Sequence, residues 1–224
     1  MEIISPTDSL EVAEHIADTL QTHLLKGKTV TWLLSGGSAL GLETAAARLL
    51  SERNVPMQTL RVSLVDERYG AVDHADENWS QLLHHGFTLP GATLYRVLQG
   101  TPPEETTQAF GRTIHQWLKT SDYSLAVFGI GADGHTAGIK ANSPAVTETN
   151  AACYYEWDDY RRITLTPSLL SELDEGIIYA MGEEKKETLQ ALITTDAPLS
   201  KQPAQVLKRI KKSTLYTDTP LVGS

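Results

Sequence analysis

The chain has 224 residues with 41% hydrophobic and 21% charged side chains, a composition typical of a globular protein long enough to bury a sizeable core. Its net charge of −9 would repel the phosphates of a nucleic acid, so we expect no nucleic-acid partner. No apolar run approaches the roughly 20 residues that span a bilayer, so we expect no membrane contact. The chain shows no basic leader before an apolar segment, and Cys153 is its single cysteine, so we expect a cytoplasmic protein.

The predicted elements alternate along the chain between helices and strands. Apolar side chains at helical spacing predict a first helix over residues 8–26, and a short run of β-forming residues at 29–34 predicts a buried strand after it. The further predicted elements are a helix around 42–49, a strand over 60–65, helices over 78–84 and 104–119, strands over 125–128, 162–165 and 177–181, a helix over 183–193 and a strand over 213–217. Strands separated by helices favour one α/β domain over residues 1–224, with a doubly wound, mostly parallel sheet that carries helices on both faces in a Rossmann-like arrangement.

Polar or glycine-rich stretches follow three of the predicted strands, at residues 35–38, 66–68 and 129–135. The carboxyl ends of parallel strands lie at one edge of a sheet, and ligands bind at that edge in open α/β folds. We therefore predict that these three stretches, although distant in the sequence, open into one common binding site.

The stretch Ser35-Gly36-Gly37-Ser38 is a candidate phosphate-binding loop. Its two glycines allow a tight turn that points backbone N–H groups at one place, and the helix that follows adds its positive end. An ordinary turn between a strand and a helix would also use glycine, so this motif alone leaves both interpretations open.

The segment from Gly129 to His135 presents one carboxylate and one imidazole in a flexible turn. Its glycines have the G-x-G spacing, but Asp133 inside the turn would repel a pyrophosphate, which argues against NAD. An imidazole takes and returns a proton near neutral pH, and a nearby carboxylate orients it. A surface histidine in a loop is the alternative, but the position after a strand favours His135 and Asp133 as catalytic residues, with Gly131 beside them at the substrate.

Positive charge for an anionic ligand is available near the same edge. The triplet Asp66-Glu67-Arg68 ends a predicted strand, where it is either a substrate-facing cluster or a solvated rim. Arg162 begins another strand, and Lys185 stands near a helix start, where it opposes the helix dipole. The sequence does not choose which cation meets a phosphate. The pair His84-His85 lacks further ligands at metal-binding spacing, so we predict no metal site.

Five motifs resemble, in their order and spacing over residues 30–190, the glucosamine-6-phosphate isomerase/6-phosphogluconolactonase superfamily. The motifs are Ser35-Gly36-Gly37-Ser38, Asp66-Glu67-Arg68-Tyr69 with Asn78 further on, Gly129-Ile130-Gly131-Ala132-Asp133-Gly134-His135-Thr136-Ala137, Arg162-Ile163-Thr164-Leu165-Thr166 and Gly182-Glu183-Glu184-Lys185. After the histidine, Thr136 and Ala137 are closer to the lactonase branch than to the deaminase branch, which usually has Ile-Ala-Phe-Asn-Glu-Pro there.

The resemblance to the lactonase branch implies hydrolysis of 6-phospho-D-glucono-1,5-lactone to 6-phosphogluconate, a step of the oxidative pentose phosphate pathway, without metal or organic cofactor. It implies that His135 activates a water molecule and that Asp133 holds the imidazole. The residues expected to bind the phosphosugar are Ser35, Gly36, Gly37, Ser38, Asp66, Arg68, Gly131, Arg162 and Lys185.

Three positions depart from the lactonase pattern, and we expect them to line the pocket. Ala39-Leu40 follow the first motif, Gly70-Ala71 follow the second, and Lys140 stands where a proline or an aromatic residue is expected. Two alternatives therefore stay open: a glucosamine-6-phosphate deaminase, which uses the same phosphate cradle, and a phosphosugar-binding protein without turnover. The sequence does not indicate an oligomeric state.

Overall fold

The computed structural model describes residues 1–157 and 160–221, and within these residues it places ten strands and six α-helices. The strands are β1 (Glu2–Ile4), β2 (Val30–Leu34), β3 (Leu60–Leu64), β4 (Asp66–Arg68), β5 (Thr93–Leu94), β6 (Tyr123–Phe128), β7 (Ala152–Glu156), β8 (Arg161–Leu165), β9 (Glu175–Tyr179) and β10 (Lys212–Tyr216). The helices are α1 (Ser9–Leu24), α2 (Leu40–Glu52), α3 (Asn78–His84), α4 (Pro103–Thr120), α5 (Pro167–Leu170) and α6 (Lys186–Thr194), with short 3-10 turns η1 (Gly37–Ala39), η2 (Pro144–Val146), η3 (Glu183–Lys185) and η4 (Pro203–Arg209).

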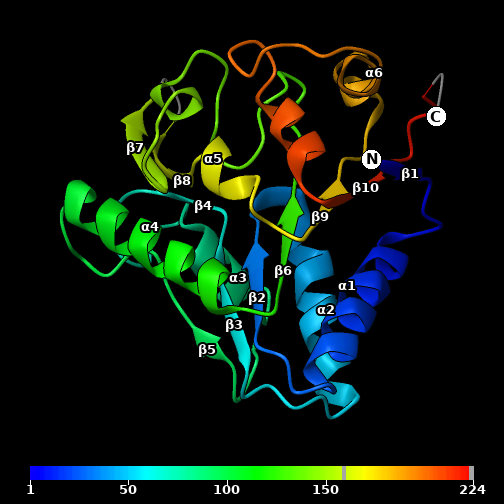
Figure 1. Ribbon diagram of the computed structural model, residues 1–224, viewed down its shortest axis with the longest axis vertical. Coiled ribbons are helices and arrows are strands. Elements are labelled where there is room, and N and C mark those ends of the chain that lie inside the picture. Colours follow the sequence, from blue (N-terminus) through cyan, green and yellow to red (C-terminus); the bar gives the residue numbers. More distant parts are fainter. Residues whose placement is uncertain (158–159, 222–224) are drawn as a thin grey trace.

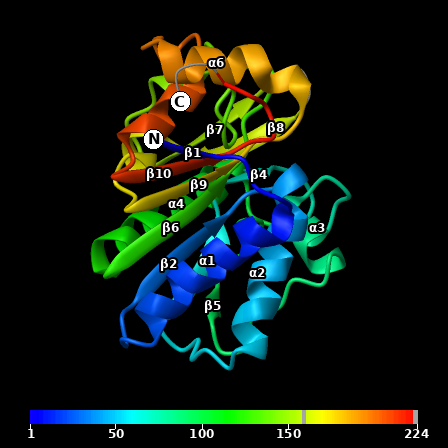
Figure 2. The ribbon, with the colours of Figure 1, turned by 90° about the vertical axis from the view of Figure 1, so that its right-hand side faces the viewer.

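The larger sheet is parallel throughout and has the strand order β1-β10-β9-β6-β2-β3-β5. Helices α1 and α2 pack against each other on one of its faces, and α4 lies on the other (Figures 1 and 2). The handedness of parallel crossovers explains this division, because β1 to β3 advance across the sheet in one direction and β5 to β6 run back. The predicted doubly wound, mostly parallel sheet with helices on both faces is confirmed.

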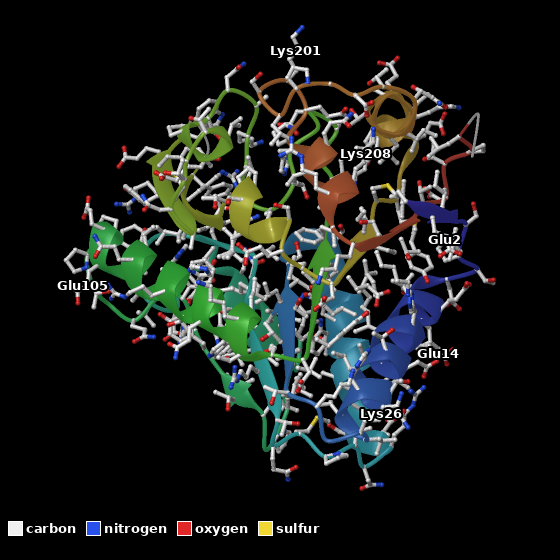
Figure 3. The ribbon with its side chains drawn as sticks, in the orientation of Figure 1. Glu2, Glu14, Lys26, Glu105, Lys201 and Lys208 are labelled. Carbon is white, nitrogen blue, oxygen red and sulfur yellow. The ribbon has the colours of Figure 1, made fainter. Side chains whose placement is uncertain are left out.

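The central strands are buried because helices cover both faces of the sheet. Every residue of β2 is buried, and so is every residue of β6 except Tyr123. The largest fully buried aromatic side chains are Trp32, Phe110 and Phe128. Charged side chains such as Glu14 and Lys201 point outward from the surface (Figure 3). The apolar runs that predicted β2 and β6 are therefore the core itself.

The predicted strand at 162–165 exists, but it belongs to a second sheet. That sheet is antiparallel, with β8 between β4 and β7, and Arg68 on β4 is the register partner of Arg162 on β8. An apolar run does not reveal its pairing partner, and β4 has the charged sequence Asp-Glu-Arg, so this second sheet was not predicted.

The strand predicted over 177–181 begins two residues earlier, at Glu175. This carboxylate is buried and has His15, Tyr123 and Lys212 as partners, with Lys212 Nζ 2.7 Å from Oε1. A charged residue followed by glycine is typical of a loop in sequence patterns, and only the tertiary partners make it part of β9. Similarly, the helix predicted over 183–193 is the turn η3 followed by α6.

The turn that follows β6 packs closely against the smaller sheet at Gly138. Its backbone N–H donates to Thr164 Oγ1 over 3.1 Å, and its carbonyl accepts from the hydroxyl of Tyr155. A Cβ atom at Gly138 would lie 2.8 Å from Thr164 Cβ and 3.2 Å from Asp66 Cβ. Only a glycine at this position lets the turn after β6 approach the strands β4 and β8 so closely.

Candidate active site

A cavity of about 220 Å³ opens where the carboxyl ends of β2 and β6 face the smaller sheet. Its lining residues are Ser35, Gly36, Gly37, Ser38, Asp66, Arg68, Asn78, Gly129, Ile130, Gly131, His135, Ala137, Arg162 and Lys185. The structure thus brings the three polar stretches together, and every predicted site residue except Asp133 lines this cavity. Its volume lies below the range of about 300–1,000 Å³ typical of drug-sized ligands, so it suits a small, polar molecule.

The loop at 35–38 continues directly into a helix. Ser35 follows β2, the turn η1 begins at Gly37, and α2 begins at Leu40. Gly37 has φ +62°, a conformation that favours glycine. A Cβ atom at Gly36 would lie 2.3 Å from Oδ1 of Asn78, so the loop passes too close to α3 for any side chain. The first-turn N–H groups of α2 and its dipole make this loop suitable for an anion.

A buried carboxyl group, Glu43, supports the loop from beneath. Its Oε1 accepts the backbone N–H of Ser35 over 2.6 Å, and its side chain is fully buried in α2. Burial raises the pKa of Glu43 well above its ordinary value, the hydrogen bond from Ser35 opposes this, and nearby Asp66 adds to it. Burial thus favours the neutral form of this carboxyl group, which repels an anion in the loop less than an ionised carboxylate would. Glu43 was not predicted as a site residue, because nothing in the sequence distinguishes it from an ordinary solvent-facing glutamate of a helix.

A second buried carboxylate, Glu67, organises one wall of the cavity. It accepts the backbone N–H groups of Arg68 and Asn78 on Oε1, over 2.8 and 2.6 Å, and that of Trp79 on Oε2 over 3.0 Å. Glu67 therefore caps the N-terminus of α3 and fixes Asn78 relative to Arg68. Burial raises the pKa of Glu67 to about 8, against the effect of these three bonds.

Asn78 lines the cavity although it was not among the predicted site residues. Its side chain is buried, and its Nδ2 donates to the backbone carbonyl of Asp66 over 3.1 Å. Its Oδ1 has no hydrogen-bond partner among the described residues. The family motif already contained Asn78, so the resemblance was the one signal in the sequence that pointed to it.

Asp66, Arg68 and Arg162 form a charged cluster at the junction with the smaller sheet. Burial raises the pKa of Asp66, while Arg162, Arg68 and His135 oppose the rise. Both guanidinium groups lie over the ring of Tyr160, with Cζ 4.6 Å from the centroid for Arg68 and 5.4 Å for Arg162. The two guanidinium groups therefore share one aromatic ring beside the cavity.

Lys185 approaches the cavity from a different direction. It is the last residue of η3 and the N-cap of α6, and it has no ion pair among the described residues. A cation at a helix start is unfavourable for the helix dipole. An anionic ligand in the cavity would compensate for this cost.

The imidazole of His135 is held by the turn that follows β6. Its Nδ1 lies 2.5 Å from Oδ1 of Asp133, and the backbone N–H of Gly131 donates to the carbonyl of His135 over 3.0 Å. A Cβ atom at Gly131 would lie 2.2 Å from Nδ1, so the ring packs directly on the glycine backbone. Among the described residues Nε2 has no partner. Asp133 stands behind the ring, outside the cavity, where it can fix the tautomer of the imidazole.

Asp133 is also bound by Lys140, whose Nζ donates to Oδ2 over 2.9 Å. Burial alone would raise the pKa of Asp133, but the hydrogen bonds from Lys140 and His135 outweigh it and hold that pKa below its ordinary value. Asp133 is therefore ionised at neutral pH.

The expectation that the three departures line the pocket is wrong. Ala39 and Leu40 are buried beneath the loop, Gly70 and Ala71 border a separate hollow beside Arg68, and Lys140 reaches Asp133 from behind. The sequence could not distinguish residues that face the cavity from residues that support it.

No described residues form a cluster of three or more histidine, cysteine or acidic side chains able to hold a metal ion. Within residues 1–157 and 160–221, no helix is both long and apolar enough to cross a membrane.

Comparison with known proteins relates this architecture to one family. Residues 8–216 match the family model of glucosamine-6-phosphate isomerases/6-phosphogluconolactonase. A 6-phosphogluconolactonase of Pseudomonas aeruginosa is 25% identical over 205 residues, which are 83% of this chain and 80% of that protein. The crystal structure of a 6-phosphogluconolactonase from Thermotoga maritima has a TM-score of 0.77 at 22% identity and covers 96% of this chain and 98% of that one. A monomeric glucosamine-6-phosphate deaminase has a TM-score of 0.78 at 14% identity, with 97% of both chains covered, so this fold occurs in proteins of both names.

Proposed function

The chain belongs to the glucosamine-6-phosphate isomerase/6-phosphogluconolactonase family, and we propose that it hydrolyses 6-phospho-D-glucono-1,5-lactone to 6-phosphogluconate. The observation that carries this proposal is one small cavity in which the imidazole of His135 faces the glycine-rich loop at 35–38 and three cationic side chains. A phosphosugar lactone needs both parts: a place for its phosphate and a base near its carbonyl carbon.

The phosphate of the substrate binds at the loop 35–38. Backbone N–H groups of the loop and of the first turn of α2 donate hydrogen bonds to the phosphate oxygens. The side chains of Arg68, Arg162 and Lys185 supply positive charge. Local positive charge is needed because the whole chain carries a net charge of −9. The bound phosphate then fixes the sugar ring, so that the lactone carbonyl lies in one orientation relative to His135.

The chemical step is general-base hydrolysis of an ester. Nε2 of His135 takes a proton from a water molecule, whose oxygen forms a bond to the carbonyl carbon C1 and generates a tetrahedral oxyanion. A cation or a backbone N–H of the cavity stabilises this oxyanion. The bond between C1 and the ring oxygen then breaks, and the imidazolium returns its proton to that oxygen. Asp133 holds Nδ1 and stabilises the protonated ring.

The activity test compares lactone opening by the wild-type chain with the spontaneous reaction. We expect acceleration by the wild type, and a loss of about 10²–10⁴-fold in kcat for His135→Asn, because a positioned general base contributes about that factor. Ser38→Asp should raise KM at least tenfold, because a carboxylate in the loop repels phosphate. A wild-type rate equal to the spontaneous rate would refute the proposal. Full activity of His135→Asn would refute the role of the imidazole.

One observation favours a second candidate, a deaminase acting on glucosamine 6-phosphate. Asp66 lines the cavity, and burial raises its pKa, so it is an acid that could move a proton between C1 and C2 of an amino sugar. Ammonia released from glucosamine 6-phosphate measures that reaction directly. Ammonia without lactone opening would assign the chain to the deaminases, and calorimetric binding of 6-phosphogluconate without either reaction would make it a phosphosugar-binding protein.

A further inference from the structure

Lys140 occupies a position that the proposed mechanism does not use. It stands where the lactonase pattern has a proline or an aromatic residue, yet its Nζ lies 2.9 Å from Oδ2 of Asp133. The other carboxylate oxygen, Oδ1, lies 2.5 Å from Nδ1 of His135. The carboxylate is therefore shared, with one oxygen for the imidazole and one for the ammonium group.

The backbone of Lys140 is anchored, so its ammonium group is delivered from a fixed point. Its N–H donates to the hydroxyl of Tyr155 over 3.2 Å, and that hydroxyl also donates to the carbonyl of Gly138. Ile139, just before it, is fully buried. The side chain of Lys140 is only 16% exposed, whereas that of Asp133 is 53% exposed. The better-buried lysine thus restrains the more exposed aspartate.

We propose that Lys140 is a positioning residue that acts on His135 through Asp133, and this rests on the proposed function of the same site. An aspartate on an exposed turn can rotate about its side-chain bonds and exchange its partner for water. With both oxygens engaged, the carboxylate keeps one plane and presents Oδ1 to the imidazole. The pKa of Asp133 lies below its ordinary value because the hydrogen bonds from Lys140 and His135 together outweigh burial, and this agrees with both carboxylate oxygens being engaged.

Sharing the carboxylate also weakens its field at the imidazole. The positive charge of Lys140 offsets part of the negative charge of Asp133, so removal of Lys140 changes both the orientation of the carboxylate and its field at the ring. Other charged groups around the ring are the cavity residues Asp66, Arg68, Arg162 and Lys185, and they stay the same in variants of Lys140.

Three variants separate charge, hydrogen bonding and packing at this position. Lys140→Met keeps the apolar stem and removes the charge, Lys140→Gln removes the charge but keeps an N–H donor, and Lys140→Arg keeps the charge. The readout is the proton NMR signal of the hydrogen-bonded Nδ1–H of His135, identified among the signals of the seven histidines by its absence in His135→Asn. This readout needs no substrate, so its result stands whether or not the chain opens the lactone.

We expect the Nδ1–H of His135 to exchange faster with water in Lys140→Met, because the released carboxylate rotates away from the ring, and to stay near the wild-type rate in Lys140→Arg, with Lys140→Gln between them. If the lactone is the substrate, kcat should fall at unchanged KM, and it should fall more for Met than for Gln. The same exchange rate in all four proteins would overturn the proposal and leave Lys140 a role in stability alone. If Lys140→Met does not fold, the Gln and Arg variants give the same decision.

Discussion

The packing of His135 on Gly131 makes a methyl group at that glycine a sharp test of the site. In Gly131→Ala the new Cβ atom would lie 2.2 Å from both Cε1 and Nδ1 of the imidazole and 2.6 Å from Oδ1 of Asp133. Non-bonded carbon contacts lie at about 3.5–4.0 Å, so the ring must move by about 1.3 Å or more. The Cβ atom would lie close to both Nδ1 of His135 and Oδ1 of Asp133, so the hydrogen bond between these two atoms must break.

The magnitudes predict a loss of turnover without a loss of folding. A 1 Å displacement of a catalytic group can cost about 10²-fold, so we expect kcat to fall at least about 100-fold, equivalent to about 2.7 kcal/mol. The His135 side chain is 30% exposed and can swing away from the new methyl group. Losing the partly exposed hydrogen bond between His135 and Asp133 costs about 0.5–1.5 kcal/mol, and replacing glycine by alanine gains about 0.4–1 kcal/mol through the unfolded state, so the two nearly cancel.

The assay measures kcat and KM for lactone opening together with the thermal unfolding midpoint. The matched control is Gly41→Ala, an exposed position in α2 outside the cavity, where a Cβ atom meets nothing within 4 Å. The control should keep its activity and gain up to about 1 kcal/mol of stability, because alanine is the better helix former. The reasoning is refuted if Gly131→Ala turns over within threefold of the wild type, or if its activity is lost only together with its fold.

Three further changes test other parts of the structure. Gly36→Ala places a Cβ atom 2.3 Å from Oδ1 of buried Asn78, so we expect at least a tenfold higher KM and a stability loss of about 1–3 kcal/mol, and an unchanged KM would contradict the packing described for the loop. Burial alone would raise the pKa of Glu175, but its three side-chain donors lower that pKa to about 2. The ionised Glu175 therefore contributes to the free energy of unfolding above its ordinary pKa of 4.5, and this contribution is lost as pH falls through about 2. Glu175→Gln should therefore cost about 2 kcal/mol of unfolding free energy at pH 7, and denaturant titrations should show the difference vanishing toward pH 2. The pKa of Glu67 is raised to about 8, so its stabilising effect is complete below pH 4.5 and is lost as pH rises from 4.5 to 8. In that interval the wild type should lose up to about 1 kcal/mol per pH unit relative to Glu67→Gln, and parallel stability curves would mean that Glu67 is ionised in the folded protein.

The parts of the fold that the sequence predicted well are those with long local patterns. The helix predicted over 104–119 differs from α4 by one residue at each end, and the strand predicted over 29–34 begins one residue later, at Val30. The short strands β4 and β7 and their pairing with β8 were not predicted, because three charged residues and a mixed aromatic run carry no alternation that marks a strand. The pairing of β4 with β8, such as that of Glu67 with Ile163, joins segments that are far apart in the sequence and is decided by packing of the whole chain.

The residues of the candidate site also divide into those that could be predicted from the sequence and those that could not. Glycines, a histidine and an aspartate next to strand ends could be found in the sequence, because each has a local physical reason to stand there. The supporting roles of Glu43 and Glu67 could not be predicted, although Glu67 stands in one of the motifs, because a carboxyl group becomes a support only when the fold removes it from water. Lys140 was noticed as a departure from the family pattern, but only its contact with Asp133 gives it a role.

The close fit of Gly138 between Thr164 and Asp66 couples the imidazole turn to the arginine-bearing strands. Neither can separate from the other without breaking that contact, so hydrogen exchange of the amides at 134–138 and of those in β8 should report a single cooperative opening. The base and the cations would then lose their order in the same rare fluctuation, rather than one after the other.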